Sequence, residues 1–368
     1  MKRIGNLYAK VISLDNLRLA DERARRGKTR TYGVRHHDEN REKNLIDLHV
    51  ALATKTYRTS EYNVFKVYKP KERDIYRLPY YPDRIVHHAI MNVVEPIWHK
   101  TFTRNTFSCI KGRGIEGCAR YVRKIIRKYE GRPLYCLKID IRKFYPSIDH
   151  EIMKQIVRRR IKDRDLLWLI DEIIDSTDGL PIGNYLSQHL ANLYLCYLMH
   201  YVNEVLRVDA AEYADDIVFF ADNKTRLHGV LKQVKMYLSK DLKLQLKSNW
   251  QIFPISMNRY DRHGRALDYV GYKFFRHQQL LRKSIKQNMA RQAAKLNRQD
   301  IDIKQYKQCI APWLGWCIHS NSINFLQTII NKDYEDILRH NALDIRGSRK
   351  RQLAVSLRHE RSACTYNG

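Results

Sequence analysis

The sequence has little of what marks a secreted or membrane protein. Its seven cysteines are scattered, odd in number and never spaced as C-x-x-C, so they support neither a zinc knuckle nor a disulfide framework. The start, MKRIGNLYAK, has no apolar core after its basic residues and does not predict a secretory signal. No apolar run is long enough to span a bilayer. We therefore expect a soluble, cytoplasmic protein without membrane contact.

Acidic residues are also scarce. The 368 residues include 68 Lys+Arg against 39 Asp+Glu, which gives a net charge of +29. Such an excess of one sign repels itself in a compact chain unless a polyanion is present. Nucleic acid is the obvious polyanion, because each neutralised phosphate releases a condensed counterion. Charge alone also fits a ribosome-associated or simply basic soluble protein.

The chain shows no internal repeats and no low-complexity linkers. Helical spacing of apolar residues extends over residues 1–60, two strand-like segments follow, and residues 83–98 predict a buried helix that ends near Pro96. A strand at 134–141, helices at 148–178 and 186–206, and a hairpin at 210–222 come next, before a largely helical remainder. Because strands and helices alternate without regular βαβ spacing, the expected fold class is α+β.

Three aspartates stand at the ends of apolar strands. Asp140 closes the segment LYCLKIDI, and Asp215 and Asp216 lie at the turn of the hairpin YADDIVFF. An Asp-Asp pair is usually a solvated turn, but carboxylates gathered at the mouth of apolar strands are repulsive unless a divalent cation is bound. If the three meet, they predict a site for two Mg²⁺ ions, or Mn²⁺ as a substitute, with the carbonyl of Ile141 as a further ligand.

At these residues the sequence resembles a known family. YADD within the hairpin is similar to the [YF]-x-D-D motif of reverse transcriptases, and LKIDIRKFYPSIDH is similar to their first catalytic strand. Further motifs follow in the family's order over roughly residues 60–330. The resemblance implies a right-hand polymerase with an antiparallel palm sheet and a helical thumb. The implied domains are an N-terminal extension with fingers (1–133), palm (134–275, with 150–180 adding helices), thumb (276–330) and a basic C-terminal extension (331–368).

The resemblance also implies roles for individual residues. Tyr145, five residues after Asp140, is expected to exclude a ribose 2′-OH, so that dNTPs are preferred over rNTPs. Lys247 is a candidate proton donor to pyrophosphate whose register against the family's lysine is unsettled, and Lys69 is expected to be solvated. Nucleotide contacts are expected from Arg73, Lys71, Ile141, Tyr145, Ile182, Gly183 and Gln188, and template or primer contacts from Lys111, Arg113, Tyr213 and Gly271.

One segment departs from the usual reverse transcriptase pattern. Most members have Gln-Gly-x-x-x-Ser-Pro where this chain has Ile182-Gly183-Asn184-Tyr185-Leu186-Ser187-Gln188. That form resembles the enzymes of diversity-generating retroelements, which copy a template-repeat RNA into cDNA with errors opposite adenine. The resemblance implies this activity, dNTPs, an RNA–DNA hybrid and a small basic pentameric accessory protein. Losing the amide at position 182 removes hydrogen bonds to the nascent pair, so we expect low fidelity.

Two alternatives stay open on the sequence. The first is a group II intron-like or other bacterial reverse transcriptase of ordinary fidelity. The second is a basic RNA-binding protein that keeps a polymerase-like fold without activity. The sequence does not identify the diversified gene, the fold of the RNA, the priming mechanism, a dependence on partners or the role of residues 331–368.

Overall fold

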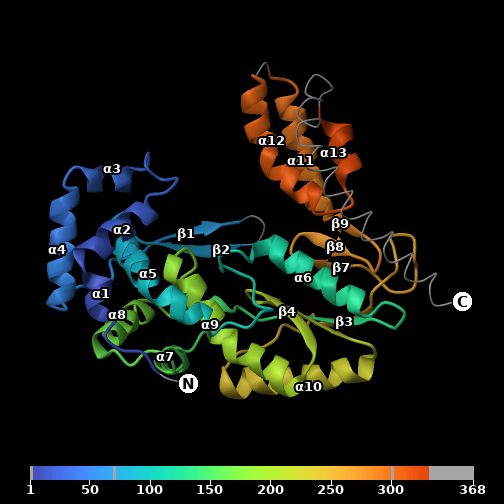
Figure 1. Ribbon diagram of the computed structural model, residues 1–368, viewed down its shortest axis with the longest axis horizontal. Coiled ribbons are helices and arrows are strands. Elements are labelled where there is room, and N and C mark those ends of the chain that lie inside the picture. The colour runs from blue at the N-terminus through green and yellow to red at the C-terminus, as the bar shows by residue number, and fades with distance from the viewer. Residues whose placement is uncertain (1–2, 69–71, 300–301, 331–368) are drawn as a thin grey trace, which may run out of the picture. The chain divides into compact units, whose positions relative to one another are not determined.

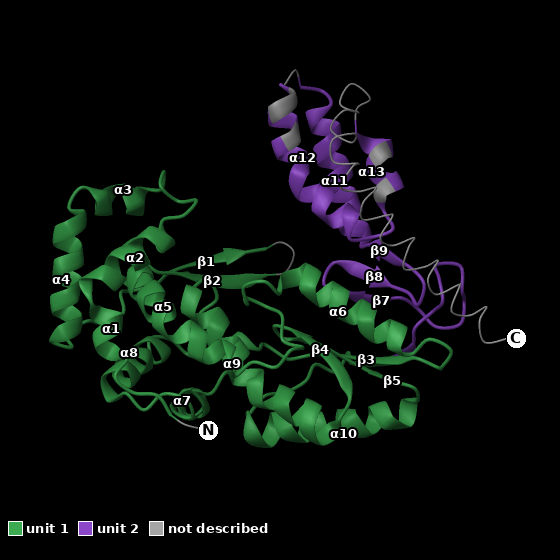
Figure 2. Ribbon diagram, in the orientation of Figure 1, with its two compact units in different colours: residues 1–252 green, residues 253–368 purple. Residues whose placement is uncertain are grey.

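The computed structural model describes residues 3–68, 72–299 and 302–330 (Figure 1). The chain divides into two compact units, residues 1–252 and residues 253–368 (Figure 2). The boundary between them lies inside the range 134–275 that we expected to form a palm. The expected C-terminal extension, 331–368, lies outside the described residues.

Unit 1 begins with helices, as the sequence predicts. These are α1 (Tyr8–Ile12), α2 (Leu14–Ala24), α3 (Tyr32–Asp38) and α4 (Arg41–Ala53). The predicted strands follow as an antiparallel hairpin of β1 (Asn63–Val67) and β2 (Arg73–Arg77). Helix α5 (Ile85–His99) matches the buried helix expected over 83–98, and it continues for three residues past Pro96. Trp98, which is fully buried beyond the proline, anchors the last turn in the core.

A four-stranded sheet in the order β4-β5-β3-β6 forms the other half of unit 1. Its strands are β3 (Tyr135–Asp140), β4 (Asp209–Tyr213), β5 (Asp216–Ala221) and β6 (Gln251–Pro254), and β5 pairs antiparallel with both β3 and β4. Helix α10 (Lys224–Asp241) packs on β3 and β5, and α6 (Gly114–Lys128) packs on β4 (Figure 1). Because both faces are covered, β5 is apolar along nearly its whole length.

The remaining helices of unit 1 surround one apolar helix. Helix α9 (Tyr185–Tyr201) contacts α5, α7 (His150–Arg158) and α10, which explains why its apolar residues are not confined to one stripe. Three short turns also occur in unit 1: η1 (Tyr80–Arg84) precedes α5, η2 (Tyr145–Ser147) precedes α7, and η3 (Val202–Leu206) follows α9. Asp163 caps α8 (Arg164–Ile174) through the Leu166 amide and also accepts from the amides of Leu7 and Tyr8.

Unit 2 contains a small sheet and three helices. Its strands β7 (Leu267–Tyr269), β8 (Tyr272–Phe274) and β9 (Gln279–Leu281) form an antiparallel meander. The helices are α11 (Lys283–Leu296), α12 (Ile303–Ile318) and α13 (Ile323–Ile329). In the described parts of both units, no helix is long and apolar enough to cross a bilayer.

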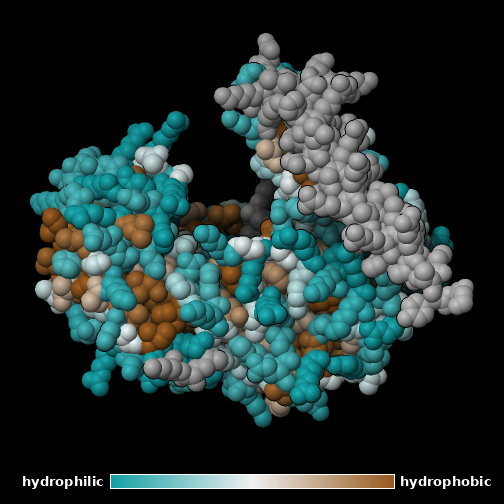
Figure 3. All heavy atoms as spheres, in the orientation of Figure 1, coloured by the Kyte–Doolittle hydropathy of each residue, from teal (hydrophilic) through white to brown (hydrophobic). Residues whose placement is uncertain are grey.

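The visible surface is mostly hydrophilic (Figure 3). Apolar atoms gather over the N-terminal helices of unit 1, where Ile46 and Val50 of α4 are about half exposed. Exposed apolar side chains of this kind are common on protein surfaces, and the charged remainder fits the composition.

Candidate active site

The sheet register brings two of the predicted aspartates side by side. Asp140 is the last residue of β3 and pairs directly with Asp216, the first residue of β5. Directly opposed residues of antiparallel strands have Cβ atoms about 4.5–5.5 Å apart and project from the same face. Two carboxylates that are 76 residues apart in sequence therefore occupy one edge of the sheet.

The third aspartate lies at the tip of the β4–β5 hairpin. Tyr213 pairs with Asp216, which leaves Ala214 and Asp215 as a two-residue turn, and Ala214 has a left-handed φ of 55°. Burial raises the pKa of Asp215, and repulsion from Asp216 and Asp140 raises it further. The three predicted carboxylates are thus close enough to disfavour one another's charge.

Two lysines offset this concentration of negative charge. The Nζ atom of Lys247 lies 2.5 Å from Oδ2 of Asp140, and the backbone amide of Lys247 donates to the Asp140 carbonyl at 2.9 Å. Lys138 Nζ lies 3.8 Å from Oδ1 of Asp216. The other side-chain oxygen of Asp140, Oδ1, is buried and accepts no hydrogen bond from the described residues. An unsatisfied buried carboxylate oxygen is costly unless a ligand meets it.

The donor set fits hard divalent cations. It consists of carboxylate oxygens, one of them without a partner, and such oxygens suit Mg²⁺ and Mn²⁺ rather than zinc. Within the described residues no three His, Cys, Asp or Glu side chains are yet arranged around a single point as ligands. The ion pair between Lys247 and Asp140 accounts for part of this, because it holds Asp140 Oδ2 on the lysine.

The carbonyl of Ile141 is available to the same edge. Ile141 forms a bridge with Leu246, and the two flanking hydrogen bonds run from Lys247 N to Asp140 O and from Arg142 N to Gln245 O. In an antiparallel pair of this kind, the bridged residue directs its own C=O away from its partner. The Ile141 carbonyl therefore points away from Leu246, as the predicted role of an additional ligand requires.

Tyr145 lies beside the carboxylates. Burial raises the pKa of its hydroxyl, and the charges of Cys109 and Asp215 raise it further, while Arg73 opposes them. The Tyr145 carbonyl accepts a hydrogen bond from Leu180 at 2.9 Å. Gly179 makes this approach possible, because a Cβ there would lie 2.6 Å from the Tyr145 carbonyl oxygen and its φ is 65°. The segment 179–180 thus holds the backbone of Tyr145, the residue expected to exclude a ribose 2′-OH.

The segment Ile182–Gly183 joins the β1–β2 hairpin to this region. The amide of Tyr76 on β2 donates to the Ile182 carbonyl at 2.8 Å. Gly183 has a φ of 122°, and a Cβ there would lie 2.7 Å from the Tyr76 carbonyl oxygen, so no larger residue fits without displacing the hairpin. The side chain of Ile182 is half-buried.

Cys109 is a residue of this site that the sequence analysis missed. It is exposed, has a left-handed φ of 52°, and its Sγ donates to Oε1 of Gln188 at 3.0 Å. It contributes to the raised pKa of the Tyr145 and Tyr213 hydroxyls, so it lies near both residues. The loop that carries Lys111 and Arg113 therefore contacts Gln188, one of the expected nucleotide contacts, through this pair. A cysteine outside any spacing motif gave no signal in the sequence.

Other predicted site residues lie elsewhere or are not described. Arg113 donates to the carbonyls of Thr103 (2.5 Å) and Thr106 (2.9 Å), so its guanidinium holds its own loop together. Lys111 is exposed on that loop. Gly271 lies in unit 2, between β7 and β8. Lys69 and Lys71 are outside the described residues.

Known proteins resemble this chain over part of its length. A family described as reverse transcriptase (RNA-dependent DNA polymerase) matches residues 69–274, more than half of the chain. Protein YkfC of Escherichia coli (strain K12) is 26% identical over 154 residues, which cover 38% of this chain and 40% of that protein. Nuclear intron maturase 1, mitochondrial, of Arabidopsis thaliana is 22% identical over 111 residues, covering 30% and 15%. The chain thus spans less than half the length of these relatives.

Solved structures of telomerase are also similar. Apo telomerase from Candida tropicalis, truncated from its C-terminal domain, matches with a TM-score of 0.47 at 10% identity, over 64% of this chain and 59% of that one. Telomerase from the same organism, in complex with the TWJ fragment of telomeric RNA, matches with a TM-score of 0.45 at 11% identity, over 69% and 52%.

Proposed function

Because this chain belongs to the reverse transcriptase (RNA-dependent DNA polymerase) family, we propose that it synthesises DNA on an RNA template, with Asp140, Asp215 and Asp216 as its catalytic carboxylates. The pairing of Asp140 with Asp216, one residue from Asp215, is the observation on which the proposal rests. The substrates are an RNA template, a primer that becomes part of an RNA–DNA hybrid, and dNTPs.

The proposed chemistry is phosphoryl transfer from a dNTP to the primer 3′-hydroxyl. Two divalent cations, when bound, supply the acidity of that hydroxyl and the charge stabilisation of the leaving pyrophosphate. Asp140, Asp215, Asp216 and the carbonyl of Ile141 are the groups that would hold them. When no cation is bound, Lys247 pairs with Asp140 and neutralises its charge. Once displaced from that carboxylate, its ammonium group is within reach of the same edge and is the proposed proton donor to pyrophosphate.

The remaining roles concern the nucleotide. Arg73, at the start of β2, is proposed to contact the triphosphate, because a planar guanidinium binds phosphate oxygens in pairs. Tyr145 is proposed to exclude the ribose 2′-OH, since its ring is packed and its backbone is held by Leu180. Replacing Tyr145 by Ala should therefore raise rNTP incorporation relative to dNTP incorporation, whereas Tyr145→Phe should retain the preference for dNTPs.

Primer extension on an RNA template with Mg²⁺ and dNTPs tests the polymerase proposal. We expect the wild-type protein to extend the primer and both Asp215→Asn and Asp216→Asn to be slower by at least about 10³-fold, because each removes charge that acts on the transition state. Asp241→Asn, an exposed aspartate at the end of α10, is the matched control and should extend normally. Equal activity in all four proteins would refute the assignment of the site.

We further propose the activity of a diversity-generating retroelement. The support is the Ile182-Gly183 segment, in which an aliphatic side chain stands where most family members have an amide. The proposed product is cDNA of a template-repeat RNA with substitutions opposite adenine, made together with a small basic accessory protein. The matched range 69–274 includes residues 69–133 of the proposed N-terminal extension and fingers and residues 134–274 of the proposed palm.

Sequencing of the cDNA decides between this proposal and a group II intron-like enzyme of ordinary fidelity. Similarity to an intron maturase keeps that alternative in view. Errors concentrated opposite template adenine, reduced by Ile182→Gln, would support the retroelement. A uniformly low error rate, unchanged by Ile182→Gln, would support the alternative. A protein that binds RNA but never extends a primer would be the non-catalytic candidate.

A further inference from the structure

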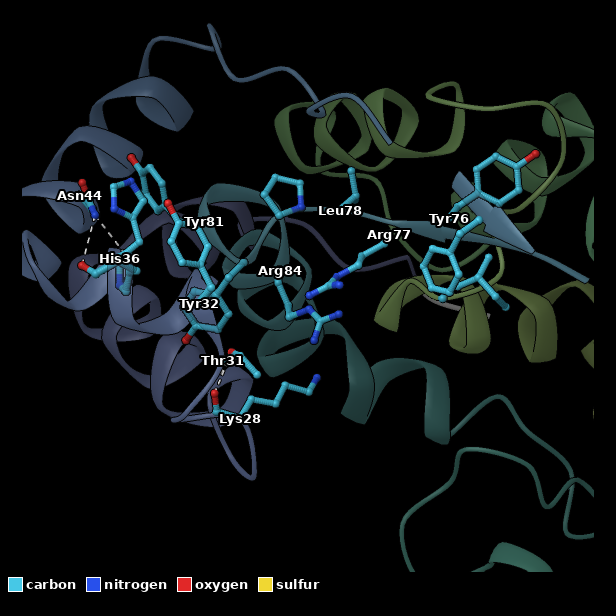
Figure 4. Close-up of a pocket in the computed structure, with 17 residues that line it drawn as sticks. Lys28, Thr31, Tyr32, His36, Asn44, Tyr76, Arg77, Leu78, Tyr81 and Arg84 are labelled. Carbon is cyan, nitrogen blue, oxygen red and sulfur yellow. Dashed lines mark hydrogen bonds between the residues drawn. The ribbon is translucent and has the colours of Figure 1, made fainter. Parts of the chain in front are cut away.

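A pocket of about 800 Å³ lies in unit 1, and none of the three candidate catalytic aspartates is among the described residues that line it (Figure 4). Its wall is formed by the segment before α3, by α3 itself, and by β2 with the residues that lead into α5. Gly183 also lines it, next to the backbone contact between Tyr76 and Ile182. The pocket thus shares one wall with the Ile182–Gly183 segment, to which the resemblance assigns nucleotide contacts. Its size is within the range of sites that hold a nucleotide.

Three cationic side chains converge in this pocket. Figure 4 shows the guanidinium groups of Arg77 and Arg84 directed toward one another, with Lys28 extending toward them. Burial lowers the pKa of Arg84, and repulsion from Arg77 lowers it further; burial and the Arg84 charge likewise lower the pKa of Lys28. No acidic residue is among the described residues that line the pocket. Cations held together in this way favour a bound anion.

Two arginines of the N-terminal helical region, Arg25 at the end of α2 and Arg41 at the start of α4, are paired very differently. Arg25 lies 2.9 Å from Asp21 and 2.7 Å from Asp38, and Arg41 lies 2.7 Å from Asp21. Within the described residues, by contrast, the side chains of Lys28, Arg77 and Arg84 make no ion pair with a carboxylate. Asp21 and Asp38 thus neutralise the nearby arginines, whereas no described carboxylate pairs with Lys28, Arg77 or Arg84. These three cations are therefore suited to an anionic ligand.

An aromatic surface stands at the rim. Tyr32 is 82% exposed, and its ring stacks on His36 with centroids 5.9 Å apart and planes 7° apart. A second stack, of His37 on Tyr81, lies deeper in the wall. Exposed flat rings beside a positive groove are the combination that binds single-stranded nucleic acid, because any base can stack on them.

We propose that Lys28, Arg77 and Arg84 bind phosphate groups of single-stranded RNA, with a base stacked on Tyr32. Arginine pairs suit phosphate oxygens geometrically, and lysine adds a point charge. The proposal rests on the proposed function in taking RNA as the polymer, and it adds a contact region that is distinct from the carboxylate edge.

Binding of a short, labelled single-stranded RNA, measured by fluorescence anisotropy without dNTPs or divalent metal, tests the proposal. The double variant Arg77→Gln/Arg84→Gln should bind roughly tenfold more weakly or worse, since hydrogen bonds to charged groups are lost. The slope of log K against log salt should fall by about 1.4, or about 0.7 per released contact. Lys232→Gln/Lys240→Gln, which removes two exposed charges from α10, is the matched control and should change little.

The base contact has its own test. Tyr32→Ala should weaken binding by roughly tenfold, because stacking of one base on an aromatic ring is lost, and Tyr32→Phe should restore it. Thermal unfolding of each variant separates binding from folding. Because Lys28, Arg77 and Arg84 repel one another, the Arg77→Gln/Arg84→Gln protein should melt no lower than the wild type.

Three outcomes would overturn the proposal. The first is an equal loss of RNA binding in the pocket variant and the α10 control, which would indicate general electrostatic attraction. The second is strong competition by a free nucleoside triphosphate, lost in the pocket variant, which would make the ligand a free nucleotide. The third is RNA binding by Arg77→Gln/Arg84→Gln that is as tight as that of the wild type. Asp215→Asn should bind RNA as tightly as the wild type and yet fail to extend a primer. Primer extension by this variant would contradict the polymerase proposal without affecting the proposed RNA contact.

Discussion

Unit 1 contains buried aspartate charge at two places, around Asp21 and at the sheet edge that carries Asp140, Asp215 and Asp216. The two places differ in how the surrounding residues balance that charge. Asp21 is fully buried, and its carboxylate accepts from Arg25, Arg41 and the Tyr80 hydroxyl. Burial alone would raise its pKa, but these hydrogen bonds outweigh burial and lower it. At the sheet edge the reverse holds, since burial and two neighbouring carboxylates raise the pKa of Asp215.

The difference separates a structural cluster from a functional one. The charge of Asp21 is neutralised by the protein itself, so the cluster is complete without a ligand. The sheet-edge cluster keeps a buried oxygen on Asp140 that accepts no hydrogen bond from the described residues, while Lys247 pairs with Asp140 and Lys138 lies near Asp216. Catalytic and cation-binding sites commonly keep such unbalanced charge, which a bound ligand then neutralises.

The largest expected effect is at the structural cluster. Asp21→Ala should lower the free energy of unfolding by about 3–5 kcal/mol, because it leaves two arginines without their shared buried partner. Chemical denaturation in urea measures this. Arg18, which pairs with exposed Glu42, provides the control, since Arg18→Gln should cost at most about 1 kcal/mol. Similar losses in the two variants would mean that Asp21 is not the structural centre of its cluster.

The comparison also shows how far the sequence alone could go. Asp140, Asp215 and Asp216 were predictable because each ends or turns an apolar strand, and strand ends set the register that brings them together. Cys109 and the Lys28–Arg77–Arg84 group were not. Their positions depend on loops and on helices packed against the hairpin, and no local pattern indicates which distant side chains will meet. Helix α5 was predictable from its apolar spacing, and burial of Trp98 keeps its last turn helical past Pro96.

The next largest expected effect is that bound Mg²⁺ raises the stability of the folded protein. This effect should depend on the sheet-edge carboxylates and not on Asp21. A ligand bound to the native state at a hundredfold its Kd adds about 2.7 kcal/mol. Titrating MgCl₂ against NaCl of equal ionic strength should therefore raise the melting temperature of the wild type. Asp215→Asn/Asp216→Asn should show no such rise, and Asp21→Asn should still show it. A rise of equal size in all three proteins would place the metal effect outside the proposed site.

Glu212 is a buried carboxyl group of a third kind, because burial favours its uncharged form in the folded protein. It is fully buried on β4, where Oε2 accepts from Thr106 at 2.8 Å, and burial raises its pKa to about 8. Between its ordinary pKa of 4.5 and about 8 only the unfolded state is deprotonated, so stability falls as pH rises. Between pH 6 and 7.5 the wild type should lose about 2 kcal/mol relative to Glu212→Gln, at about 1.36 kcal/mol per pH unit. Parallel pH profiles would show that Glu212 is charged when folded.

The smallest expected effect has the opposite sign from that at Asp21. Asp215→Asn removes one of three mutually repelling carboxylates, so without metal it should raise the free energy of unfolding by about 0.5–1 kcal/mol while abolishing primer extension. Because the folded pKa of Asp215 is raised, its charge costs stability only above its ordinary pKa of 3.8, and the gain should vanish toward pH 3. The exposed Asp241→Asn control should be neutral at both pH values. A loss of stability in Asp215→Asn at pH 7 would mean that Lys247 and Lys138 already satisfy the cluster, and the distinction drawn from Asp21 would then disappear.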